Sequence, residues 1–189
     1  QCSANDAGRM AAAARRRQPT FELAWAPQAG PQAAFVNCPL NDVVYGGARG
    51  GGKTDAALGD WAIHAERYGA EAKGLMIRRT RKALESTINR AKQIFRGMAV
   101  WKESKSGFVW RNGAVLVMNY LERDDDADQY QGHDYTRVYV EELTQFASPA
   151  PIDKLRATLR SGTGVPTGFR GTCNPGGAGH TWVKDRYID

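Results

Sequence analysis

Cysteine is scarce in this sequence, with three residues among 189, at positions 2, 38 and 173. An odd number at such wide spacing does not suggest a disulfide framework or a zinc site, which favours a reducing compartment. No run approaches the roughly 18 apolar residues of a membrane span. Residues 1–17 contain no long apolar core followed by a cleavage site, so we predict neither a signal peptide nor a membrane partner.

Basic residues outnumber acidic ones, with 26 Lys and Arg against 20 Asp and Glu, a formal net charge of +6. This balance favours polyanionic partners such as DNA, RNA or nucleotides, although a basic protein kept soluble by its charge has the same composition. The 42% of hydrophobic residues and 24% of charged residues are typical of a globular fold. We expect a flexible N-terminal arm over residues 1–20 and one folded domain over 21–189.

Short apolar runs bounded by turn residues alternate with segments of helical periodicity from residue 40 onward. Asn112-Gly113 between two β-rich runs predicts a hairpin, and Gly69 and Gly97 are expected to end helices. The predicted strands cover residues 42–45, 74–78, 108–110, 114–118, 137–141 and 169–173, and the predicted helices cover 53–68, about 84–95 and 148–160. Strands that alternate with helices predict an α/β fold with a mainly parallel sheet and helices on both faces.

An eight-residue stretch fits the pattern G-x-x-x-x-G-K-[ST], the Walker A motif. It reads Gly47-Ala48-Arg49-Gly50-Gly51-Gly52-Lys53-Thr54. Glycines let backbone N–H groups surround phosphate oxygens, and the positive end of the following helix faces the same oxygens. Lys53 can then reach the β- and γ-phosphates, and the Thr54 hydroxyl can bind Mg²⁺. A flexible glycine-rich loop is the alternative, but it would not require Lys-Thr at its end, so we predict a P-loop that binds ATP.

Two carboxylates, Glu141 and Glu142, follow the apolar strand predicted at residues 137–141. We expect this strand to adjoin the P-loop strand, with Glu141 holding Mg²⁺ and Glu142 activating the attacking water. The usual first acid is Asp, so Glu141 lengthens the reach by one methylene. A solvated strand end is the alternative interpretation. The aspartates within residues 124–128 are interpreted as a solvated run rather than a metal site.

These motifs together resemble the ATPase domain of the large terminase subunit of tailed bacteriophages, the DNA-packaging motor. The resemblance covers about residues 28–189 and rests on several separated motifs in the family's order. They are residues 45–54, Tyr130-Gln131-Gly132, 140–146, 155–161, 174–177 and 180–184. The resemblance implies a RecA-like P-loop NTPase fold of the ASCE class.

The resemblance also implies roles for individual residues. Gln32 matches the family's adenine-reading glutamine, and a side-chain amide can both donate to and accept from the adenine edge; an exposed loop glutamine is the alternative. Arg49 matches the basic P-loop residue that senses or stabilises the γ-phosphate. Thr172-Cys173-Asn174 occupies the place of the coupling motif, with Cys173 expected to be a small packed residue rather than a nucleophile. The candidate arginine fingers, from this subunit or a neighbour, are Arg79, Arg156 and Arg160, each of which could equally form a surface ion pair.

By the same resemblance, the chain is expected to hydrolyse Mg-ATP and drive double-stranded viral DNA into the procapsid. The implied partners are double-stranded DNA, further copies of the chain in a homo-oligomeric ring, the portal protein and the small terminase subunit, at the portal vertex in the host cytoplasm. The family's large subunit continues into an RNase H-like nuclease, whereas this sequence ends at Asp189, so we expect an isolated motor domain without nuclease activity. The alternatives are another P-loop nucleic-acid motor, such as a RecA-like helicase, and a nucleotide-binding module without turnover.

Overall fold

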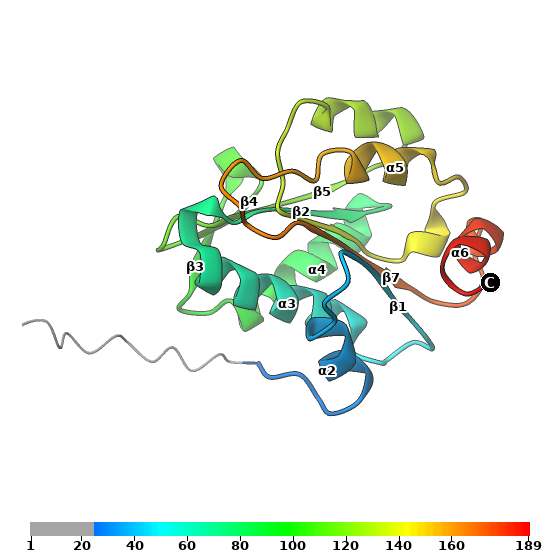
Figure 1. Ribbon diagram of the computed structural model, residues 1–189, viewed down its shortest axis with the longest axis horizontal. Helices are drawn as coiled ribbons and strands as arrows, with labels where there is room; N and C mark the ends of the chain where they lie inside the picture. Colours follow the sequence, from blue (N-terminus) through cyan, green and yellow to red (C-terminus); the bar gives the residue numbers. More distant parts are fainter. Residues whose placement is uncertain (1–24) are drawn as a thin grey trace, which may run out of the picture.

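The computed structural model describes residues 25–189, and the arm expected over residues 1–20 lies outside them. A seven-stranded sheet forms the centre, in the order β1-β7-β6-β2-β5-β4-β3 (Figure 1). The first five strands in this order pair in parallel, whereas β5-β4 and β4-β3 pair antiparallel. The strands are β1 Asp42–Gly46, β2 Lys73–Arg78, β3 Ala99–Lys102, β4 Gly107–Trp110, β5 Val115–Tyr120, β6 Arg137–Val140 and β7 Gly168–Cys173.

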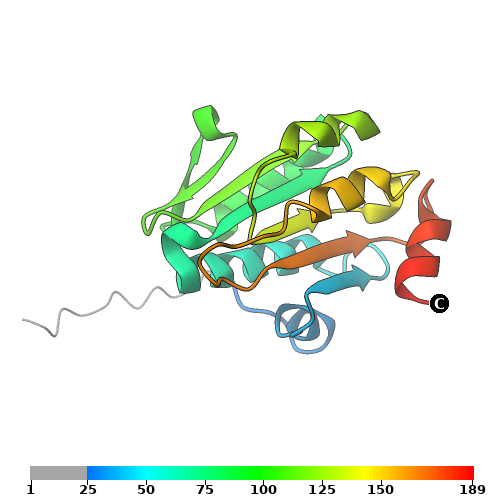
Figure 2. The ribbon, with the colours of Figure 1, turned by 45° about the horizontal axis from the view of Figure 1, so that its top comes forward.

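Helices cover both faces of this sheet, as the alternating pattern predicts. The α-helices are α2 Pro31–Val36, α3 Lys53–Tyr68, α4 Arg81–Ile94, α5 Ala150–Arg156 and α6 His180–Tyr187, and the 3-10 helices are η1 Gly69–Glu71, η2 Glu103–Lys105, η3 Asp124–Tyr130 and η4 Leu143–Gln145. Figure 2 shows the strands side by side, with blue β1 near one edge and the green β3–β4 hairpin at the other. No helix within residues 25–189 is long and apolar enough to cross a membrane.

Two apolar clusters hold the layers together, one on each face of the sheet. Trp61 of α3 and Ile94 of α4 belong to the first cluster, together with Met76 of β2. Leu155 of α5 belongs to the second, with Ile77 of β2. Met76 and Ile77 are consecutive and point to opposite faces, as strand geometry requires. Because both faces of the sheet are covered, the central strands are apolar without alternation. This explains why they occur in the sequence as short continuous apolar runs.

Most predicted elements are confirmed, and α3 has the bounds that its periodicity predicts. Its C-terminal cap is Gly69, with a φ of 54°, a left-handed conformation that glycine adopts without strain. The helix predicted over residues 148–160 is shorter, because α5 ends at Arg156. The sequence analysis missed α2, β3 and α6, three short elements of four to eight residues.

The expected neighbourhood of the acidic strand is wrong by one strand. β6, which carries the acids, does not pair with the P-loop strand β1, because β7 lies between them. Gly46 at the end of β1 is paired with Cys173 at the end of β7, and Gly171 of β7 is paired with Val140 of β6. The carboxyl ends of all three strands still meet at one edge of the sheet. The coupling segment, as we name residues 172–174 after their predicted role, therefore lies between the P-loop and the acids.

Candidate active site

The P-loop connects the end of β1 to the first residue of α3, the geometry that its sequence predicts. Gly52, the N-cap of α3, has a φ of 65°, a left-handed conformation that disfavours any other residue. The Lys53 ammonium donates hydrogen bonds to the carbonyls of Gly47, at 3.0 Å, and Ala48, at 2.6 Å. The lysine is thereby folded over the loop, beside the N-terminus of a sixteen-residue helix whose dipole attracts anions.

Gln32 fastens α2 to this loop. Its Nε2 donates to the Gly52 carbonyl at 3.0 Å, and its Oε1 accepts from the Gln28 backbone N–H at 2.8 Å. The side chain is 4% exposed. A Cβ on Gly52 would lie 2.0 Å from Gln32 Nε2, so the close approach requires glycine there. Both functional groups of the amide are thus engaged with the protein, and adenine reading by Gln32 stays a prediction.

A cavity of about 410 Å³ opens over the P-loop. Its lining joins three strand ends and one helix start: Arg49, Gly50, Gly51, Gly52, Lys53, Thr54, Asp55, Arg78, Glu142, Thr172 and Asn174. The cavity thus combines three cationic side chains with backbone amides that suit an anionic ligand. Within residues 25–189, Arg78 Nε and Asn174 Oδ1 are buried without hydrogen-bond partners. The three cations and the backbone amides fit a triphosphate, and Thr54 supplies a hydroxyl that fits Mg²⁺.

The two acids are placed differently, and only Glu142 lines the cavity. Glu141 is 1% exposed and lies towards α4. Its Oε2 accepts a hydrogen bond from Thr87 of α4 at 2.9 Å and lies 3.1 Å from Arg78 Nη1. Arg78 Nη2 lies 3.6 Å from Glu142 Oε2. One guanidinium therefore faces both carboxylates, and the assignment of Glu141 to the metal stays a prediction.

The backbone of Glu142 is held in a conformation that residues with a Cβ rarely adopt, with φ 54° and ψ 53°. Its N–H donates to the Thr172 hydroxyl at 3.2 Å, and its carboxylate accepts a hydrogen bond from the Gln145 amide. The next residue of β7, Cys173, is buried, and burial raises the pKa of its thiol although the Lys53 charge opposes that shift. Cys173 packs in the apolar cluster of that face of the sheet, and the expectation that it is not a nucleophile stays a prediction.

The coupling segment is joined to the acidic strand a second time. The hydroxyl of Thr144 in η4 donates to the Asn174 carbonyl at 3.0 Å, and the Gly179 N–H donates to the Thr144 carbonyl at 2.8 Å. The segment after β7 and the segment after β6 are therefore fixed to one another directly outside the cavity.

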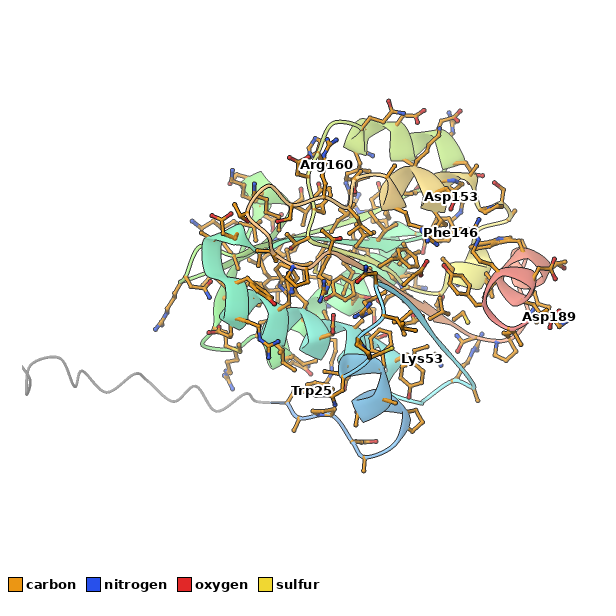
Figure 3. All side chains as sticks on the ribbon, in the orientation of Figure 1. Trp25, Lys53, Phe146, Asp153, Arg160 and Asp189 are labelled. Atoms are coloured by element: carbon orange, nitrogen blue, oxygen red, sulfur yellow. The ribbon has the colours of Figure 1, made fainter. Side chains whose placement is uncertain are left out.

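None of the three candidate fingers lines the cavity of its own chain. Arg79 lies 3.0 Å from Asp124 and over the Phe146 ring. Arg156 forms an ion pair with Asp42 at the opposite end of β1, and Arg160 pairs with Asp134. Figure 3 shows Lys53 and Arg160 on opposite sides of the sheet. These arginines could therefore act as fingers only in the cavity of a neighbouring copy, and that role stays a prediction.

Sequence reasoning missed Arg78 and Asp55, both of which line the cavity. Arg78 is the last residue of β2, so its position at a parallel strand end was available as a signal. Asp55 follows Thr54 directly. Within residues 25–189 there is no group of three or more His, Cys, Asp or Glu side chains that could hold a metal ion.

Comparison with known protein families agrees with this geometry. A sequence model described as "Terminase large subunit, T4likevirus-type, N-terminal" matches residues 44–183, which include the P-loop, both acids and the coupling segment. The chain belongs to the terminase large subunit family. No curated protein sequence matches the chain.

Solved terminases share this fold at low sequence identity. The large terminase of the thermophilic bacteriophage D6E matches with a TM-score of 0.69 and 16% identity, over 87% of this chain and 43% of that one. The ATPase domain of the Thermus phage P74-26 large terminase matches with a TM-score of 0.57 and 14% identity, over 80% and 66%. The HK97 bacteriophage large terminase gives 0.61 and 12%, over 84% and 36%. The chain thus spans less than half the length of the D6E protein.

Proposed function

We propose that the chain is the ATPase motor of a large terminase, which hydrolyses Mg-ATP and drives double-stranded viral DNA into the procapsid. The observation that carries the proposal is the meeting of Glu142 with Lys53, Thr54 and Arg49 in one cavity, in a chain of the terminase family. Crystal structures of the D6E terminase with ADP and with ATP-gamma-S support a nucleotide in this fold. A homo-oligomeric ring, the portal protein and the small terminase subunit are the partners of this proposal, at the portal vertex in the host cytoplasm.

In the proposed reaction, the P-loop amides and Lys53 bind the triphosphate, and Lys53 exchanges its bonds to the Gly47 and Ala48 carbonyls for phosphate oxygens. Thr54 would hold Mg²⁺, with Glu141 behind the cavity wall as an outer partner; the ion offsets phosphate charge when bound. Glu142 orients a water and accepts its proton as the water oxygen attacks the γ-phosphorus. The bond to the β-phosphate oxygen breaks, and ADP and inorganic phosphate are released.

Charge that develops on the γ-phosphate in the transition state needs a cation. Arg49 and Arg78 line the cavity and are available within the chain. A further arginine from a neighbouring copy would raise the rate by roughly 10³–10⁵-fold, as arginine fingers do. The isolated domain is therefore expected to hydrolyse ATP slowly, and more rapidly when it is assembled.

Phosphate release with Mg²⁺ tests this proposal. We expect Glu142→Gln to lower turnover by about 10²-fold or more while ATP-analogue affinity is kept, because the substitution removes the base and leaves the cradle. Glu122→Gln, which changes an exposed carboxylate outside the cavity, is the matched control. Equal phosphate release from wild type and Glu142→Gln would remove Glu142 from this role.

Nucleotide affinity tests the cradle separately. We expect Lys53→Ala to weaken ATP binding, because the ammonium contributes a charge-assisted bond to the phosphates, whereas Lys73→Ala at the opposite end of β2 serves as the control. Unchanged affinity of Lys53→Ala would contradict the P-loop assignment. A chain that binds ATP without turnover would be a nucleotide-binding module, and strand separation of duplex DNA would favour a helicase.

A further inference from the structure

The net charge of the chain is concentrated in one segment. Residues 81–111 contain eight Lys or Arg and two Glu, a net charge of +6, which equals that of all 189 residues. Acidic and basic residues outside this segment balance one another. The segment comprises α4 and the β3–β4 hairpin, and all eight of its basic side chains are exposed. The charge therefore belongs to one region of the surface rather than to the whole protein.

Four of these basic residues lie on the outward side of helix α4, because Leu84, Thr87, Ala91 and Ile94 bury its opposite side, and Arg96 follows two residues after its end. We refer to Arg81, Lys82, Arg90, Lys92 and Arg96 as the α4 basic surface. The remaining exposed residues of the helix are mostly polar and uncharged: Ser86, Asn89 and Gln93. The single acid of the helix, Glu85, is paired with Arg81 at 3.2 Å.

Three of these positive charges form no ion pair within the described part of the chain. Among residues 25–189, Lys82, Lys92 and Arg96 have no ion-pair partner, whereas Arg90 is paired with Asp55. A groove of about 490 Å³ separates α4 from the hairpin. Its lining includes Arg81, Lys92, Glu85, Glu103, Trp101 and Tyr120. The surface thus offers free cations and hydrogen-bond donors along a helix, which is the composition that phosphate backbones select.

We propose that the α4 basic surface binds the phosphate backbone of duplex DNA. Helix α4 has 14 residues from Arg81 to Ile94 and is about 21 Å long at 1.5 Å per residue, which corresponds to roughly six base pairs of a duplex. Backbone contacts carry no sequence requirement, so the surface suits a motor that must move along any sequence. The inference rests on the proposed function only for the choice of duplex DNA as the polyanion.

The acidic helix η3 of a second copy is the alternative partner for the α4 basic surface. Most charges of η3, however, are already paired within its own chain. Asp124 lies 3.0 Å from Arg79 and Asp128 lies 2.6 Å from Lys154, while Asp126 accepts the backbone N–H of Arg123. A surface neutralised within its own chain attracts α4 weakly. A duplex, with one charge per about 1.7 Å of its axis, attracts it strongly.

The α4 basic surface is joined to the nucleotide cavity by one ion pair. Arg90 Nε donates to Asp55 Oδ1 at 2.8 Å, and Arg90 Nη2 donates to Asp55 Oδ2 at 2.6 Å. Asp55 follows Thr54 of the P-loop and lines the cavity itself. A two-pronged bond of this kind fixes orientation as well as distance. DNA bound on α4 would therefore be only one ion pair away from the ATP-binding loop.

Fluorescence anisotropy with a labelled duplex of about 30 base pairs, measured over a range of salt concentrations, tests the surface. The test variant combines Lys82→Gln, Lys92→Gln and Arg96→Gln, since Gln keeps helix propensity and none of the three lines the nucleotide cavity. The control variant combines Lys73→Gln, Arg123→Gln and Lys184→Gln, which removes the same charge from exposed positions elsewhere. ATP turnover without DNA and the far-UV circular dichroism spectrum report whether each variant is folded.

We expect the test variant to lose at least about tenfold in duplex affinity at low salt and to reduce the salt slope by nearly three, about 0.9 per lost phosphate contact. The control variant should lose less than about threefold, because long-range charge alone is screened. Equal losses in both variants would overturn the proposal. So would unchanged duplex binding together with a change in self-association, which would identify a second copy as the partner. Absence of ATP turnover in the wild-type chain would contradict the proposed function but not the proposal that the α4 basic surface binds DNA.

Discussion

The Nη1 atom of Arg78 lies 3.1 Å from the Oε2 atom of Glu141. Arg78 is 9% exposed and Glu141 is 1% exposed, so the two charges share a site from which water is largely excluded. The same guanidinium faces Glu142 at 3.6 Å. Arg78 thus connects the buried acid of the strand end with the acid that lines the cavity. Neither glutamate can move without affecting its bond to this arginine.

Removal of Arg78 is predicted to destabilise the fold as well as the site. Arg78→Met leaves the Glu141 charge buried without its partner, and we expect the free energy of unfolding to fall by about 3–5 kcal/mol. Urea unfolding measures the change. Arg79→Met, the neighbouring residue with a partly exposed pair to Asp124, should cost only about 1 kcal/mol.

The double variant Arg78→Met, Glu141→Gln separates the pair from the rest of Arg78. We expect it to recover part of the lost stability, because a neutral amide is less costly to bury than an unpaired carboxylate. ATP turnover should stay low, since Glu142 has still lost its cationic neighbour. Equal losses of unfolding free energy in Arg78→Met and Arg79→Met would show that the buried Arg78–Glu141 pair contributes no more to stability than the partly exposed Arg79–Asp124 pair.

Gln32 offers a test between two roles, because its amide is bonded to the P-loop and to Gln28. We expect Gln32→Ala to weaken the binding of ATP and GTP by similar factors, since the loop loses its bond at the Gly52 carbonyl, worth about 1 kcal/mol. Isothermal titration with both nucleotides measures this. Gln131→Ala, an exposed glutamine, is the control. A selective loss of ATP over GTP would instead establish adenine reading.

Local features were predictable from the sequence. The P-loop, α3 and its end at Gly69 are set by neighbours along the chain: glycines that tolerate positive φ, a helical period and a C-cap. The Asn112-Gly113 pair likewise lies in the turn of the β4–β5 hairpin, where Gly113 supplies a positive φ of 93°. Each of these requires only residues within one or two elements.

Non-local features were not predictable in the same way. The insertion of β7 between β1 and β6 depends on how distant segments cross, and the pattern of apolar runs is the same for either order. The orientation of Glu141 and Glu142 depends on a positive φ at Glu142 that the residue type disfavours. Arg78 and Arg79 are adjacent and alike in sequence, yet Arg78 ends β2 and lines the cavity, whereas Arg79 lies beyond the strand and pairs with Asp124. The position of the strand end therefore decides which arginine lines the cavity.

The Thr172 hydroxyl accepts a hydrogen bond from the strained backbone of Glu142. We expect Thr172→Val, which keeps the shape and removes the acceptor, to lower ATP turnover by about fivefold to tenfold, the equivalent of one hydrogen bond of about 1 kcal/mol. Thr172→Ser should retain turnover near wild type, and nucleotide affinity should change little in either variant. Steady-state phosphate release gives both parameters. Equal turnover of Thr172→Val and wild type would remove Thr172 from the positioning of Glu142.

Acid sensitivity is predicted from His64, which is buried in α3 and hydrogen-bonded with Thr136 at 2.9 Å. Burial, with Arg137, Arg170 and Arg67 nearby, lowers the pKa of His64 to about 3. The unfolded chain, with an ordinary histidine pKa of about 6.5, binds this proton first, so stability is lost as pH falls below about 6.5.

We expect the stability difference between wild type and His64→Gln to shrink by about 1.4 kcal/mol per pH unit from about pH 6 to 4. Exposed His133→Gln should show no such slope in urea unfolding at matched pH, and a flat difference for His64→Gln as well would contradict the assignment.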